Sequence, residues 1–236
     1  MIAVDQILRV PLLPVLAAQG LLVRRKAQLL PEPVGARHGQ SGSGPKLRLL
    51  IAGDSSAAGV GAQTQDTALS GQLVTHLAPH FSVDWRVEAT TGHITPDTIA
   101  RLKDLPKQRF DVVVFALGVN DVTRATTSGQ FYQRQAKLMA LLRARFTPRL
   151  ILTSGVPKME LFPALPQPLA WVLGQQAARL DRAQERLAET VPELHRLPLD
   201  IPVEPRFAAT DGYHPSPAFY QLWARSLGNQ IIAHHT

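Results

Sequence analysis

The chain has 236 residues, of which 45% are hydrophobic and 18% are charged. A single compact domain of this length buries roughly 70% of its unfolded surface, so one α/β domain is favoured over two small ones. The chain contains no cysteine, which excludes a disulfide scaffold, a thiolate metal site and a cysteine nucleophile.

The formal net charge is +7, and positive charge attracts nucleic acid or anionic lipid. The residues up to Pro45 carry +3 of this charge, and the rest is spread thinly along the chain. No basic stripe is interleaved with aromatic side chains, as a nucleic-acid-binding face requires. We therefore expect a solvated basic surface and no nucleic-acid partner.

The amino-terminal segment is the most apolar part of the chain. Residues 7–23 contain polar or helix-breaking residues that disfavour a membrane span: Arg9, Pro11, Pro14, Gln19 and Gly20. Asp5 and one preceding arginine make residues 10–18 a poor export signal. We expect a cytoplasmic protein, with export the less favoured alternative.

A basic cluster, Arg24-Arg25-Lys26, follows the apolar stretch directly. An apolar helix beside such a cluster can lie in a membrane interface, so peripheral membrane contact through residues 7–26 is an open hypothesis. Packing of this segment on the domain is the favoured reading. Residues 36–46 are rich in glycine and serine and are expected to be a linker. The predicted division is therefore an arm and linker over 1–46 and a domain over 47–236.

From residue 47 onward, strand-like apolar runs alternate with segments of helical period, which is typical of a parallel sheet covered by helices on both faces. Five strands are predicted, at 47–53, 82–88, 111–117, 149–154 and 194–199. Ser216-Pro217 is expected to begin a last helix. The inward face of that helix is predicted to carry Tyr220, Trp223, Leu227 and Ile231.

Ligands of an open parallel sheet bind beyond the carboxyl ends of its strands. The polar residues at those ends are Gly53-Asp54-Ser55-Ser56, Thr90-Thr91-Gly92, Gly118-Val119-Asn120-Asp121 and, in a final loop, Asp211-Gly212-Tyr213-His214. A serine hydroxyl becomes a nucleophile when a histidine takes its proton, and a carboxylate can orient that histidine. The spacing of three residues between Asp211 and His214 allows the carboxylate to reach Nδ1 while Nε2 faces a hydroxyl.

Taken together and in this order, Gly53-Asp54-Ser55, Gly92, Gly118-x-Asn120 and Asp211-x-x-His214 resemble the motifs of the SGNH (GDSL) hydrolase family. The resemblance covers residues 47–236. It implies a flavodoxin-like, three-layer α/β/α fold with a five-stranded parallel sheet and a serine esterase or lipase activity that uses no cofactor.

Carried onto this chain, the resemblance implies that Ser55 is the nucleophile, His214 the general base and later acid, and Asp211 the group that orients the imidazole. The implied oxyanion donors are the backbone N–H groups of Ser55 and Gly92 and the side-chain amide of Asn120. The chain reads Gly-Asp-Ser-Ser where the family motif has leucine last, so Ser56 is a rival hydroxyl. Ser55 is preferred, and Ser56 is expected either to hydrogen-bond within its loop or to face the helix.

The remaining polar candidates are given structural roles. Asp54 and Asp121 are expected to accept hydrogen bonds that hold their loops, whereas His93 is a candidate pocket residue. The other histidines show no metal-ligand spacing, and no Lys-Ser/Thr follows the glycines after Ser55. Neither a metal nor a nucleotide is therefore predicted.

Residues 155–170 form a proline-rich, apolar loop after the fourth strand, with Met159, Leu161, Phe162 and Leu165. These side chains either line an acyl pocket or pack over the next helix. A small-molecule acyl ester of short to medium chain is the predicted substrate. An acyl thioesterase or lysophospholipase, a carbohydrate O-acetyl esterase and a non-catalytic flavodoxin-like binding domain stay open, and the sequence does not determine the oligomeric state.

Overall fold

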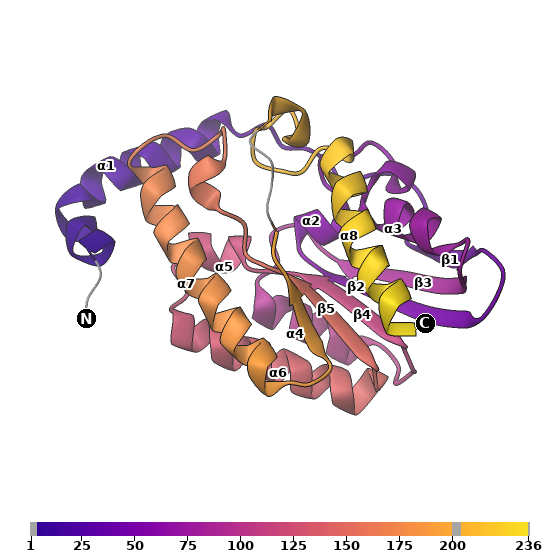
Figure 1. Cartoon of the computed structure of the whole chain (residues 1–236). Helices are drawn as coiled ribbons and strands as arrows, with labels where there is room; N and C mark the ends of the chain where they lie inside the picture. Colours follow the sequence, from indigo (N-terminus) through magenta and orange to yellow (C-terminus); the bar gives the residue numbers. More distant parts are fainter. Residues whose placement is uncertain (1–3, 200–203, 236) are drawn as a thin grey trace.

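The computed structural model describes residues 4–199 and 204–235 and contains a six-stranded sheet of order β1-β3-β2-β4-β5-β6 (Figure 1). The strands are β1 His38–Ser41, β2 Lys46–Gly53, β3 Ser82–Ala89, β4 Val112–Ala116, β5 Leu150–Ser154 and β6 Leu194–Leu197. Strands β2 to β6 pair in parallel. Their order is that of a flavodoxin-like sheet, so the predicted fold class is confirmed.

The sheet also contains a strand that the sequence did not predict. β1 pairs antiparallel with β3 at the edge of the sheet, with His38 opposite Arg86 and Ser41 opposite Val83. It lies inside residues 36–46, which were expected to be a linker. Its HGQS sequence lacks an apolar run because both faces of the strand stay largely accessible, as the alternation of exposed and half-buried residues shows. The five predicted parallel strands are therefore joined by a sixth, antiparallel one.

Helices cover both faces of the sheet and give three layers (Figure 1). α3 Leu69–Leu77 and α8 Pro217–His235 pack on one face, and α4 Thr95–Asp104, α6 Ser128–Phe146 and α7 Leu169–Thr190 cover the other. Short helical turns occupy the loops: α2 Ser55–Ala58, α5 Val119–Thr123, η1 Gln65–Thr67, η2 Met159–Leu161 and η3 Pro205–Phe207.

The central strands are apolar throughout because both of their faces are buried. In β2, Leu49 and Ile51 pack against α3 and α8, whereas Leu50 and Ala52 face the helices of the opposite layer. All four side chains are at most 1% exposed. Successive residues of a strand point to opposite faces, so one continuous apolar run supplies both halves of the core.

The last helix begins as predicted. Pro217 is its first residue, and the Ser216 hydroxyl accepts a hydrogen bond from the Phe219 N–H at 3.4 Å. The predicted inward side chains, Tyr220, Trp223, Leu227 and Ile231, are all buried. α8 therefore closes one face of the sheet and holds the preceding loop, residues 208–216, over the carboxyl ends of the strands.

The amino-terminal arm is a helix, α1 Val4–Lys26, which runs without interruption through Pro11 and Pro14. It lies against α7 (Figure 1), with Asp5 buried in ion pairs to Arg9 and Arg179. By length and composition alone, it is the one helix within residues 4–199 and 204–235 that could cross a membrane. The division of the chain at residue 46 stays a prediction.

Candidate active site

Ser55 lies at the end of β2, where the chain turns into the short helix α2. Gly53 ends the strand at a φ of +146°, and a Cβ there would overlap the Ala116 carbonyl oxygen of β4. Glycine therefore allows β2 and β4 to approach closely where the turn begins. The turn leaves the side chain of Ser55 facing a cavity, although the residue is only 8% exposed.

Three predicted residues meet in one hydrogen-bonded chain. The Ser55 Oγ lies 3.0 Å from Nε2 of His214, and Nδ1 of the same ring lies 2.5 Å from Oδ2 of Asp211. An ionised carboxylate can only accept, so with Asp211 charged the proton belongs on Nδ1, and Nε2 accepts from the serine hydroxyl. The arrangement can move a proton from an alcohol to an imidazole.

The loop that carries His214 is fixed by Asp211. Its Oδ1 accepts from the backbone N–H groups of Tyr213 and His214, at 3.0 Å each, and leaves Oδ2 for the imidazole. Burial raises the pKa of Asp211, but the hydrogen bonds from the His214 ring and the two backbone amides outweigh it and lower the pKa overall. Asp211 is therefore ionised at neutral pH and can stabilise an imidazolium.

Ser56 does not share this arrangement. Its hydroxyl donates to Oδ1 of Asp54 at 2.8 Å, and its backbone N–H donates to the same oxygen at 3.0 Å. The rival hydroxyl is thus engaged within its own turn, and Asp54 caps α2, as the sequence predicted for both residues. Burial raises the pKa of Asp54 to about 6, against the opposing effects of the Ser56 hydrogen bonds and the nearby His214.

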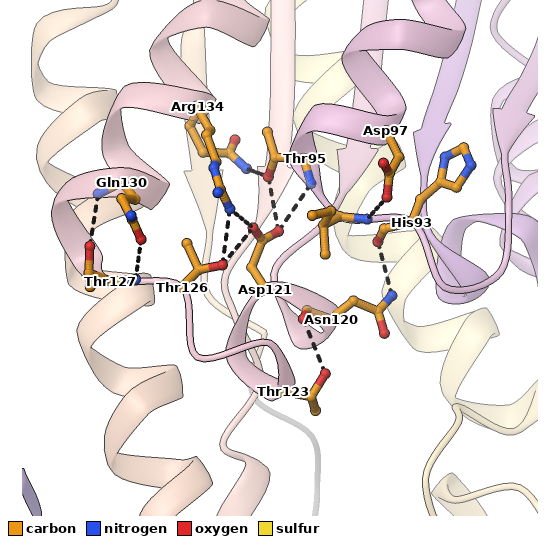
Figure 2. Close-up of polar contacts among 12 residues, drawn as sticks. His93, Thr95, Asp97, Asn120, Asp121, Thr123, Thr126, Thr127, Gln130 and Arg134 are labelled. Carbon is orange, nitrogen blue, oxygen red and sulfur yellow. Dashed lines mark hydrogen bonds and ion pairs between the residues drawn. The ribbon is translucent and has the colours of Figure 1, made fainter.

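Gly92 and Asn120, the other two residues that the resemblance singles out, lie in loops that are tied to each other. The Asn120 amide donates to the His93 carbonyl at 3.0 Å (Figure 2), and the Thr90 N–H donates to the Gly53 carbonyl at 3.2 Å. Gly92 has a φ of +84° with open space where a Cβ would stand, so its conformation rather than crowding favours glycine. Neither residue is among those that line the cavity beside Ser55, and their roles as oxyanion donors stay a prediction.

Asp121 points away from Asn120 and into the protein (Figure 2). It is fully buried and accepts from the Thr95 N–H at 3.1 Å and the Thr95 hydroxyl at 3.0 Å. Arg134 of α6 lies 3.4 Å from its other oxygen. The carboxylate therefore joins the start of α4 and the body of α6 to the loop of Asn120, which agrees with its predicted structural role.

A cavity of about 600 Å³ opens beside Ser55 and His214. Leu161 and Phe162 of the proline-rich loop contribute to its wall, whereas Met159 of the same loop is fully buried in the core. Different side chains of the loop therefore line the cavity and pack in the core, and the use of that cavity for an acyl group stays a prediction. The rest of the apolar lining includes Leu117, Val119, Pro163, Leu199, Pro205, Phe207 and Trp223.

His93 lies outside the described lining of that cavity. Its ring is half-buried and Nδ1 has no hydrogen-bond partner, and burial lowers its pKa. The suggestion that it is a pocket residue therefore finds no support in the described part of the chain. No group of three or more acidic or histidine side chains that could hold a metal ion occurs within residues 4–199 and 204–235.

Glu32 is a contact of the Gly92 loop that the sequence did not reveal. Its Oε1 accepts from the N–H of Thr91 at 2.9 Å and from the Thr91 hydroxyl at 2.8 Å, and its Oε2 pairs with Arg37 at 2.7 Å. It thereby holds the loop of Gly92 from a position 59 residues earlier in the chain. The only signal in the sequence is that Glu32 is the first acid after Asp5.

The buried carboxyl of Asp54 makes folding stability depend on pH. Its pKa rises from an ordinary 3.8 to about 6, so the folded state binds a proton that the unfolded state has already lost between these values. The ionised carboxylate lowers the free energy of unfolding. This loss is absent below about pH 4, grows as pH rises and reaches about 3 kcal/mol above pH 6.

Asp54→Asn removes the charge and keeps Oδ1 as the acceptor for both Ser56 donors. Urea unfolding at pH 4 and pH 8 is expected to show the variant gaining about 3 kcal/mol relative to the wild type at the higher pH. If the variant and the wild type differ in unfolding free energy by the same amount at both pH values, the ionised form of Asp54 does not destabilise the folded state.

The chain matches known proteins both in sequence and in fold. The family model described as GDSL-like Lipase/Acylhydrolase matches residues 51–222. The GDSL-like esterase Rv1075c of Mycobacterium tuberculosis is 29% identical over 197 residues, which cover 77% of this chain and 60% of the relative. The chain thus spans about three-fifths of that relative's length.

Solved structures share the fold at low identity. A lipase/acylhydrolase from Enterococcus faecalis has a TM-score of 0.61 at 18% identity, with 80% of this chain and 96% of that chain covered. A carbohydrate esterase family 2 enzyme from Corynascus thermopiles (Myceliophthora fergusii) has a TM-score of 0.64 at 17% identity, over 82% and 68% of the two chains. The family model covers most of the chain, so this protein belongs to the GDSL-like lipase/acylhydrolase family.

Proposed function

We propose that this protein hydrolyses carboxylic esters through an acyl-enzyme on Ser55, with His214 as base and acid and Asp211 as its orienting partner. The observation that carries the proposal is the continuous chain from Ser55 through His214 to Asp211, with links of 3.0 and 2.5 Å at the edge of an apolar cavity. The family assignment gives the reaction class, and the geometry supports these residues.

In the first half of the reaction, Nε2 of His214 takes the proton of Ser55 while Oγ attacks the ester carbonyl carbon. The imidazolium that forms is stabilised by the ionised Asp211. Collapse of the tetrahedral intermediate breaks the ester bond, and His214 gives its proton to the departing alkoxide. In the second half, His214 takes a proton from water, the hydroxide attacks the acyl carbonyl, and Ser55 leaves with the proton returned.

Negative charge on the former carbonyl oxygen needs fixed donors. We propose the N–H groups of Ser55 and Gly92 and the amide of Asn120 for this role. One N–H of the Asn120 amide is used by the His93 carbonyl, which leaves the second for a substrate oxygen. A neutral amide stabilises the oxyanion without holding the carboxylate product by a full charge.

The apolar lining favours an acyl group over a sugar. Leu161, Phe162 and Phe207 form walls suited to a hydrocarbon chain, and a cavity of about 600 Å³ has room for more than an acetyl group. We propose short- to medium-chain acyl esters as substrates. A panel of p-nitrophenyl esters, acyl-CoA thioesters, lysophospholipid and acetylated sugars separates this proposal from the thioesterase, lysophospholipase and carbohydrate-esterase alternatives.

We further propose that the catalytic domain acts on the cytoplasmic side of the cell. Arg24, Arg25 and Lys26 flank the carboxyl-terminal end of α1, next to the domain. The cytoplasmic leaflet carries anionic lipid, which attracts a basic cluster beside an apolar helix. Export remains the alternative.

Ser55→Ala is expected to abolish turnover of p-nitrophenyl butyrate, because no other hydroxyl in this turn is bonded to His214. Ser56→Ala is the matched control and is expected to keep most of the activity, since its hydroxyl is bound to Asp54. Initial rates of the two purified variants show whether Ser55 or Ser56 is the nucleophile. Loss of turnover in Ser56→Ala alone would assign the nucleophile to residue 56 and would refute the proposal.

Asn120→Ala removes the proposed side-chain oxyanion donor. A loss on the order of a hundredfold in kcat, with a small change in KM, is expected because the hydrogen bond acts mainly in the transition state. Steady-state kinetics on the same ester measure it. A kcat within about threefold of the wild type would exclude Asn120 from the oxyanion site.

Glu32 is proposed as a positioning residue that holds the loop of Gly92. Glu32→Ala is expected to lower kcat roughly tenfold to a hundredfold while KM changes little, because a misplaced Gly92 amide weakens transition-state binding. Glu32→Gln keeps an oxygen that can accept from both Thr91 donors and is expected to restore most of kcat. If both variants lose thermal stability but keep the wild-type kcat, Glu32 has only a structural role.

A further inference from the structure

α1 packs on α7 through its polar side chains. Asp5 is 2% exposed and is held by two hydrogen bonds from the Arg179 guanidinium, at 2.8 and 2.6 Å. Farther along the helix, the Gln19 amide donates to the Gln167 carbonyl at 2.6 Å and accepts from the Leu169 N–H at 3.1 Å. Asp5 and Gln19 thus lie on the side of α1 that faces the protein.

The opposite face of α1 is apolar and exposed. Ile7, Val10 and Leu13 are 61, 77 and 63% exposed. Every exposed residue within 7–23 is apolar: Ile7, Leu8, Val10, Pro11, Leu13, Pro14, Val15, Ala17, Ala18, Leu21 and Leu22. A surface helix of a soluble domain normally shows the reverse arrangement. An exposed apolar surface of this extent is typical of an interaction site.

Charge indicates what covers this face. Arg24, Arg25 and Lys26 are exposed at its carboxyl-terminal end. No acidic residue occurs between Asp5 and Glu32 in the sequence. Anionic lipid headgroups attract such a basic cluster, and the adjoining acyl region takes up apolar side chains.

We propose that α1 lies flat in the interface of an anionic bilayer while it stays docked on α7. A membrane-spanning α1 would have to leave α7, break the Asp5–Arg179 pair and carry Arg9 into hydrocarbon. In the flat orientation these polar groups keep their protein partners.

This orientation also brings the bilayer near the cavity. Gln167 and Leu169, which bind Gln19, lie near the end of the proline-rich loop whose Leu161 and Phe162 line the cavity. If the proposed function holds, acyl esters dissolved in the bilayer are the substrates with the shortest path to Ser55. The docking itself is a binding property and does not depend on catalysis.

The test is co-sedimentation of the full chain with vesicles of phosphatidylcholine alone or mixed with phosphatidylglycerol. The wild type is expected to bind the anionic vesicles in preference, and salt is expected to weaken binding. Replacing the cluster by Arg24→Gln, Arg25→Gln and Lys26→Gln should lower the partition coefficient on the order of a hundredfold. Ile7→Gln, Val10→Gln and Leu13→Gln together should lower it by roughly tenfold or more.

A matched control removes the same charge elsewhere: Lys103→Gln, Lys107→Gln and Lys137→Gln, all exposed in the wild type. It is expected to keep wild-type partitioning, and circular dichroism checks that each variant is folded. An equal loss of vesicle binding in the control would show that only net charge matters and would overturn the proposal.

Two other results would also contradict the proposal. Resistance of the wild type to alkaline extraction from cell membranes would show that α1 spans the membrane. A dimer that the Ile7/Val10/Leu13 variant abolishes would show that a second copy of the chain covers this face.

Discussion

The site depends on one imidazole that bridges two groups far apart in the chain. His214 lies 159 residues from Ser55 and hydrogen-bonds it, while the neighbouring Asp211 holds the other ring nitrogen. Without the carboxylate, the ring could turn or carry its proton on the wrong nitrogen. Without the turn after β2, the hydroxyl would not reach the ring. The parallel sheet supplies the common edge at which these loops meet.

Three carboxylates around the site each hold a different loop at the carboxyl ends of the strands. Asp54 engages Ser56 and leaves Ser55 for His214. Asp121 joins the loop of Asn120 to α4 and α6, and Glu32 holds the loop of Gly92 from the amino-terminal side. Two of these carboxyls, Asp54 and Asp121, have pKa values raised chiefly by burial. Hydrogen-bond donors within the loops offset part of the free-energy cost of burying each carboxylate.

The parts of the fold that were predictable are those with a local pattern. The apolar runs predicted all five parallel strands, and Ser216-Pro217 predicted the start of α8. β1 was missed because its HGQS sequence has no apolar alternation, and its pairing with β3 comes from tertiary contact. The encounter of Ser55, Asp211 and His214 was predictable from motif order, whereas Glu32 was not, since its partner Thr91 lies 59 residues away. The exposed apolar face of α1 could not be predicted for the same reason. Which side of the helix is covered depends on its tertiary contact with α7.

Mass spectrometry of the protein labelled by a fluorophosphonate tests the central claim most directly. Such a probe reacts fast only with a hydroxyl whose proton is taken by a base. The account predicts one adduct, localised by peptide fragmentation to Ser55, and labelling that falls to the background rate in His214→Ala. An adduct on Ser56, or labelling of Ser55 that is independent of His214, would contradict it.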